Sequence, residues 1–123
     1  MMLNDVMSGD ALAAYEAREE LQFQRAQEAH IRGIKAYSRL LALVENSDSG
    51  QPRIVSKFLA SIYNSYRFKF DMTDLRRLDE DIGNDILICI DAHRWGIQDL
   101  NDSIQDGNQR IHNMLKERGF IEQ

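Results

Sequence analysis

PRIVSKFLASIYNSY, residues 52–66, carries the strongest helical pattern in the chain. Its apolar residues recur at steps of one and three, which places them on one broad face of a helix with a period of 3.6 residues. They are Ile54, Val55, Phe58, Leu59, Ile62, Tyr63 and Tyr66. Pro52 suits the first turn of a helix, where its missing N–H is not needed. We therefore predict a central core helix over residues 52–66.

The segment before it predicts one long helix over residues 10–45, capped by Asp10. Its first half is rich in strong helix formers, but its apolar stripe is thin and becomes strong only from Ile34 onward. Gly33 marks either a bend or a close contact with another helix. We expect residues 1–9 to be flexible. Residues 10–32 are left with two interpretations: a weakly packed edge that projects from the body, or a surface for a partner, including a second copy of the chain.

YRFKFD, residues 66–71, alternates aromatic and basic residues as a strand or a nucleic-acid-binding ribbon would. No second strand is predicted for it to pair with. Asp71 suits a helix N-cap, and Phe70 and Leu75 occupy the two positions of a hydrophobic staple around that cap. The segment is therefore interpreted as a joint between helices, with Phe70 touching Leu75.

Two more helices complete the prediction. Apolar residues at steps of three and four predict one helix over residues 72–95, with Gly96 at its end, and another over residues 98–118, interrupted by Gly107. The stripe of the former includes His93, which we expect to be half-buried. The predicted fold is a single all-α domain over residues 1–123: a compact bundle of about four helices with a long N-terminal helix.

Composition excludes several classes of protein. The chain has 123 residues, a net charge of −5 and one cysteine, Cys89, so it can form no intramolecular disulfide and no thiolate zinc cluster. The net charge argues against a generally basic nucleic-acid binder. The N-terminus MMLNDVMSGD has neither the basic nor the apolar part of a signal peptide, and no apolar run is long enough to span a membrane. We expect a cytoplasmic protein.

The stretch from Gly33 to residue 90 resembles a family of small uncharacterised bacterial proteins, known as a domain of unknown function and frequent on plasmids and integrative elements. The matching residues are Arg39, Leu40, Leu41, Gly50, Gln51, Val55, Phe58, Leu59, Asn64, Phe70, Asp71, Thr73, Asp74, Leu75 and Asp79. The chain departs at Ile62 and Tyr63, where the family tends to have tryptophan. The N-terminal extension and the C-terminal helix lie outside the resemblance. It implies a mobile-element setting and supplies no catalytic residues.

The sequence contains no recognisable motif for catalysis or metal binding. The densest carboxylates, Asp79, Glu80, Asp81 and Asp85, lack the loop spacing of a calcium site and are interpreted as a solvated acidic face. The three histidines form no metal-binding pattern. Cys89 falls on an apolar stripe, which predicts a buried and inert thiol. We expect a non-enzymatic protein with no cofactor and no metal.

Charge is unevenly distributed along the chain. Residues 51–69 carry a net charge of +4 without a single acid, and residues 70–106 carry −7. The two segments could attract each other within the fold, or they could face different partners. The candidate partner-binding residues are Arg53, Lys57, Arg67 and Lys69.

Two function classes follow. The first is a small interaction protein that binds another macromolecule stoichiometrically. The mobile-element setting that the resemblance implies would make it an inhibitor of host defence or an accessory regulator. The second is a nucleic-acid-binding accessory protein that uses residues 51–69. The acidic net charge favours the first class, with a protein as the partner.

Overall fold

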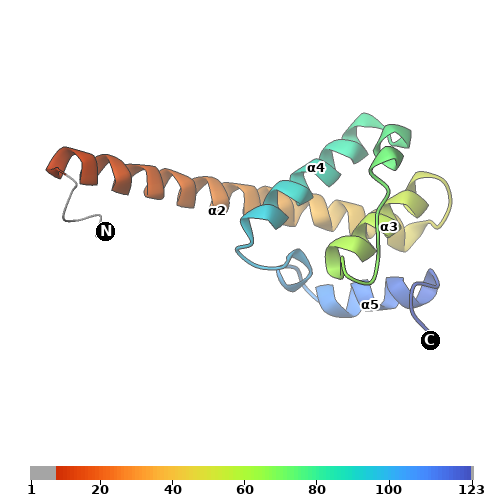
Figure 1. Ribbon diagram of the computed structural model, residues 1–123. Coiled ribbons are helices and arrows are strands. Elements are labelled where there is room, and N and C mark those ends of the chain that lie inside the picture. The colour runs from red at the N-terminus through yellow and green to blue at the C-terminus, as the bar shows by residue number, and fades with distance from the viewer. Residues whose placement is uncertain (1–7, 123) are drawn as a thin grey trace.

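The computed structural model describes residues 8–122, and every regular element in this range is a helix. The elements are α2 (Gly9–Asn46), α3 (Gln51–Tyr63), the 3₁₀ helix η1 (Met72–Arg77), α4 (Glu80–Trp95), the 3₁₀ helix η2 (Leu100–Asp102) and α5 (Gly107–Glu117). The other elements gather around the C-terminal half of α2, while its N-terminal half projects from the body (Figure 1). The predicted all-α bundle with a long N-terminal helix is confirmed. No helix among the described residues is long and apolar enough to cross a membrane.

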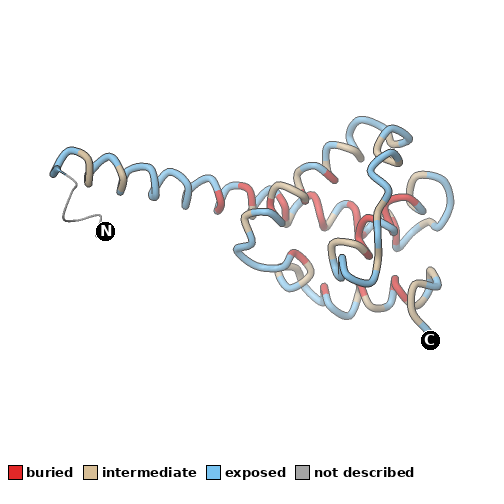
Figure 2. The backbone as a smooth tube through the Cα atoms, in the orientation of Figure 1, coloured by how far each residue is buried: buried red, intermediate tan, exposed pale blue. Residues whose placement is uncertain are grey.

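Helix α3 lies in the core, as its pattern predicts. Phe58 and Leu59 are 4% and 0% exposed, and the buried residues concentrate on α3, α5 and the C-terminal half of α2 (Figure 2). The helix ends at Tyr63, however, and Tyr66 is 94% exposed. Asn64 explains the early end, because its side-chain and backbone oxygens both accept the N–H of Arg67, at 3.1 and 3.2 Å, and so close a turn. The prediction that Tyr66 belongs to the apolar face is wrong.

The first helix begins one residue earlier than predicted. Ser8, and not Asp10, is its N-cap, and the Ser8 hydroxyl accepts a hydrogen bond from the N–H of Ala11 at 3.1 Å. Gly9 is already helical, and residues 1–7 of the segment predicted to be flexible lie outside the described residues. No residue of α2 before Ala26 is buried.

Helix α2 packs most extensively against α4, and Gly33 permits a close approach of the two helices. A Cβ atom on Gly33 would overlap the Cβ of Ala92 and stand 3.2 Å from a methyl group of Leu100. Of the two interpretations of Gly33, a close helix contact is therefore correct.

Replacing Gly33 with Ala is expected to destabilise the protein by about 1–2 kcal/mol, because overpacking exceeds the gain in helix propensity. Gly83→Ala in α4 is the matched control: open space surrounds that position, so the same change should stabilise by up to about 1 kcal/mol. Urea unfolding of both variants measures the difference. A double variant with Ala92→Gly should restore stability, and equal effects at Gly33 and Gly83 would contradict the close contact.

Asp71, in the joint after α3, is a helix N-cap as predicted, but the helix that it caps is the short 3₁₀ helix η1. Asp71 accepts a hydrogen bond from the N–H of Thr73 at 2.9 Å and caps η1. The α-helix itself starts only at Glu80, because Leu78 is extended and Asp79 is the N-cap of α4. Gln51 fixes this second start: its side-chain oxygen accepts the backbone N–H of Asp79 at 2.7 Å. The prediction of one helix over 72–95 is wrong, whereas the contact of Phe70 with Leu75 stays a prediction.

The last predicted helix is also divided. The segment before Gly107 forms η2 and turns, and Asp106 adopts a left-handed conformation with φ of 56°. Helix α5 begins at Gly107, where a Cβ atom would overlap the carbonyl oxygen of Asn101. Gly107 is therefore a break with a close backbone contact, and the prediction of a helix over 98–118 is corrected to Gly107–Glu117.

Candidate partner-binding surface

The four predicted partner-binding cations are all exposed, but Arg53 lies at the opposite end of α3 from Arg67 and Lys69. Arg53 lies in the first turn of α3 and is paired with Asp48, 3.1 Å away. Arg67 and Lys69 follow the other end of α3, and the helix rise places that end about 15 Å from Arg53 along the axis. Within residues 8–122, Lys57, Arg67 and Lys69 take part in no ion pair.

The acidic segment does not neutralise the basic one. Asp85 instead forms a two-bond ion pair with Arg39 of α2, at 2.7 and 3.0 Å. Asp91 pairs with Arg94 at 2.6 Å. No ion pair among the described residues joins segment 51–69 to segment 70–106, so the two segments make no direct charge contact with each other.

An open groove of about 360 Å³ lies beside Lys69. Its apolar lining comes from α3, α4 and the joint between them: Phe58, Ile62, Phe68, Phe70, Met72 and Ile90. The aromatic rings are fixed by edge-to-face packing, with Phe58 against Phe70 at 5.6 Å between centroids and Phe68 against Phe120 at 5.7 Å. Both Phe68 and Phe70 therefore pack within the fold, as a joint between helices requires.

Polar groups and a methionine surround this groove. The ammonium group of Lys69 donates to the carbonyl oxygen of Ser65 at 2.7 Å, which leaves two of its three N–H groups for a ligand. Met72 is 62% exposed. His93 also lines the groove, from α4, and it is exposed, so the expected half-buried position is wrong. Sequence reasoning missed the groove. The one feature of the sequence that pointed to this region was the alternation of aromatic and basic residues in 66–71.

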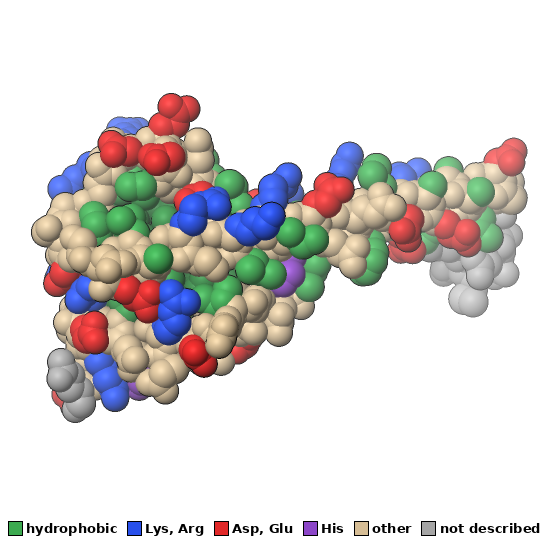
Figure 3. Space-filling model, turned by 180° about the vertical axis from the view of Figure 1, so that it is seen from behind, with side chains coloured by type: hydrophobic (Ala, Val, Ile, Leu, Met, Phe, Trp, Pro, Cys, Tyr) green, Lys and Arg blue, Asp and Glu red, His purple; other side chains and the backbone are tan. Residues whose placement is uncertain are grey.

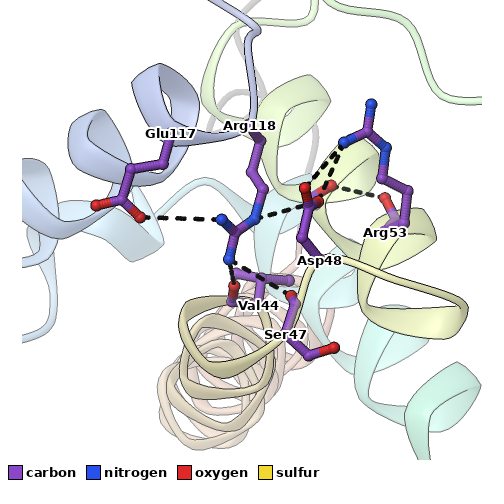
Figure 4. Close-up of polar contacts among 7 residues, drawn as sticks. Val44, Ser47, Asp48, Arg53, Glu117 and Arg118 are labelled. Atoms are coloured by element: carbon purple, nitrogen blue, oxygen red, sulfur yellow. Dashed lines mark hydrogen bonds and ion pairs between the residues drawn. The ribbon is translucent and has the colours of Figure 1, made fainter.

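Arg118 forms a second polar site that sequence reasoning missed (Figure 4). From the end of α5, its guanidinium donates to the carbonyl oxygens of Val44 and Ser47 at the C-terminus of α2. Its Nε also lies 3.2 Å from a carboxylate oxygen of Asp48, in an ion pair whose geometry is not that of a hydrogen bond. Asp48 thereby joins Arg118 to Arg53. The side chain of Arg118 is only 12% exposed, so this site holds the fold together.

Cys89 has the surroundings of a core residue and not those of a catalytic thiol. Cys89 is buried, its thiol points to the carbonyl oxygen of Gly33 at 3.9 Å, and burial raises its pKa to about 12. A thiol with such a pKa is a poor nucleophile at neutral pH. Among residues 8–122, no group of three or more His, Cys, Asp or Glu side chains is arranged to hold a metal ion.

The projecting part of α2, residues 9–25, is a further candidate surface. Phe23 is 56% exposed, and helical spacing places it on the same face as Leu12, Tyr15 and the buried Ala26. Glu19 and Gln22 interrupt this face. On the side seen in Figure 3, apolar, charged and polar side chains alternate along the projection, whereas acidic side chains gather at the top of the body, where η1 meets α4. The projection is thus a less continuous apolar surface than the groove.

Residues 34–119 match the Family of unknown function (DUF7673). The chain belongs to this family. The predicted resemblance to a domain of unknown function is therefore confirmed, and the DUF7673 match extends through α5, which the sequence comparison over residues 33–90 left outside. Every residue that lines the groove falls within the match, and the projecting part of α2 precedes it. No curated protein and no solved structure matches the chain.

Proposed function

We propose that this protein acts by stoichiometric binding of an acidic surface on another protein. One observation carries the proposal: Lys57, Arg67 and Lys69 are exposed and have no carboxylate partner within residues 8–122, although acids dominate the segment that follows. Exposed cations that the fold leaves without partners favour an electrostatically complementary ligand. Arg53 contributes less to this surface, because Asp48 already pairs with it.

A protein partner is favoured over nucleic acid by the rest of the surface. The net charge is −5, and a carboxylate-rich face lies on the same small body, so a phosphate backbone would be repelled beyond its immediate contacts. The resemblance to proteins of plasmids and integrative elements supports a cytoplasmic partner from host defence or from a regulatory complex. Non-enzymatic action is part of the same proposal and rests on the inert Cys89 and on the lack of a catalytic motif.

A triple charge reversal tests the proposal. Lys57→Glu, Arg67→Glu and Lys69→Glu together should reduce capture of the native partner from cells of the source organism by about tenfold or more, because three contacts become repulsive. Arg53 is left unchanged, since Arg53→Glu would break the ion pair with Asp48. The control carries the same charge change outside the basic segment, as Lys35→Glu, Arg76→Glu and Lys116→Glu. Quantitative mass spectrometry of the captured proteins, with thermal unfolding of each variant, gives the measurement.

Two results would oppose the proposal. Equal capture by the triple variant and by the wild type would move the contact to residues 9–25 of α2, where a partner or a second copy of the chain would bind. Retention on double-stranded DNA that falls steeply with salt, and is abolished by the triple variant but not by the control, would establish the nucleic-acid function instead.

A further inference from the structure

We infer that the groove beside Lys69 receives a large apolar side chain from an acidic segment of the partner protein. This inference rests on the proposed function and adds what the partner must present: one apolar anchor next to carboxylates. Interfaces concentrate their binding energy in such anchors, which fill pockets surrounded by polar groups. The groove supplies a pocket of this kind at the edge of the basic segment.

The pocket has a preformed aromatic floor. Phe58 is nearly buried, and its ring meets Phe70 at an interplanar angle of 77°, while Phe68 meets Phe120 at 85°. Rings held in this way lose little conformational freedom when a ligand binds. The volume of about 360 Å³ is near the lower end of the range for ligand pockets, about 300–1,000 Å³. It suits one or two side chains.

Positive charge at the groove favours acidic residues on either side of the apolar anchor in the partner's sequence. Lys69 is itself part of the lining and keeps two N–H donors free, and the guanidinium of Arg67 lies 5.2 Å from the ring centroid of Phe68. Among residues 8–122, none of those that line the groove carries a carboxylate. An apolar side chain flanked by glutamate or aspartate therefore matches both the floor and the rim, whereas a basic segment would be repelled.

Short fluorescein-labelled peptides test the inference without knowledge of the natural partner. The probe carries one tryptophan between glutamates, and its binding is followed by fluorescence anisotropy. A second peptide has alanine in place of the tryptophan, and a third has lysines in place of the glutamates. We expect both to bind about tenfold or more weakly than the probe. Equal binding of the alanine peptide would show that the groove receives no anchor.

Two protein variants locate the binding. Met72→Glu places a charge at the mouth of the groove without emptying the core, since Met72 is 62% exposed, and should weaken binding of the probe by about tenfold. Leu87→Glu makes a comparable change on α4 at a side chain that is 54% exposed and outside the groove, and should change affinity by less than about twofold. Equal effects of the two variants would overturn the inference. If Lys69→Glu weakened binding but Met72→Glu did not, the inference that the groove receives the anchor would be wrong, whereas the proposed contact of the partner with the basic residues would be supported.

Discussion

Replacing Phe58 with Ala is expected to lower the free energy of unfolding by about 3–5 kcal/mol, the range for emptying an aromatic core site. Phe58 lies on α3 in the core cluster and is 4% exposed. The change also removes the edge-to-face partner of Phe70, and such a pair adds about 0.5–1.5 kcal/mol beyond the burial of area. The loss should therefore lie in the upper part of the range. It should also reduce peptide binding, because Phe58 lines the groove.

Urea unfolding monitored by far-ultraviolet circular dichroism measures this effect. Phe23→Ala is the matched control, because it deletes the same side chain from the projecting part of α2, where Phe23 is 56% exposed. Its cost should stay within about 0.5 kcal/mol. Similar midpoints for the two variants would show that α3 is not the core helix.

Arg118→Ala is expected to destabilise the protein by about 1.5–3 kcal/mol, the range for hydrogen bonds to charged groups. Arg118 supplies donors to the carbonyl oxygens of Val44 and Ser47 at the C-terminus of α2. A cation at this end of a helix also interacts favourably with the helix dipole. Without it, these carbonyl oxygens lose a charged donor, and Asp48 keeps only Arg53 as a partner. The contact between α5 and the end of α2 should loosen.

Arg118→Lys separates charge from geometry. Lysine keeps the positive charge but cannot reach two carbonyl oxygens and a carboxylate with one planar group, so an intermediate loss is expected. Lys116→Ala, in the last turn of the same helix, should cost less than about 0.5 kcal/mol. Hydrogen exchange of the last turn of α2 gives a local readout, and unchanged protection there in Arg118→Ala would contradict the capping role.

The order of the α-helices could be predicted from the sequence, because local physical chemistry specifies it. The apolar steps between Ile54 and Ile62 place these residues on one face of α3 in any surroundings, and Asp71 can cap whichever helix follows it. Cys89 on an apolar stripe predicts burial for the same reason. The sequence also showed that cations lie near Phe68 and Phe70. It gave no indication of the groove that these two rings help to line.

Tertiary contacts decided the rest. The start of α4 depends on Gln51, which lies 28 positions before Asp79 in the chain, and the end of α2 depends on Arg118 at the far end of the sequence. Within residues 8–122, Lys57, Arg67 and Lys69 form no ion pair, whereas Asp85 of the acidic segment pairs with Arg39 of α2. The groove exists because α3, the joint and α4 converge without filling the space between them. Periodicity and capping report on neighbours along the chain, whereas ion-pair partners and unfilled volume depend on distances through space that no local pattern encodes.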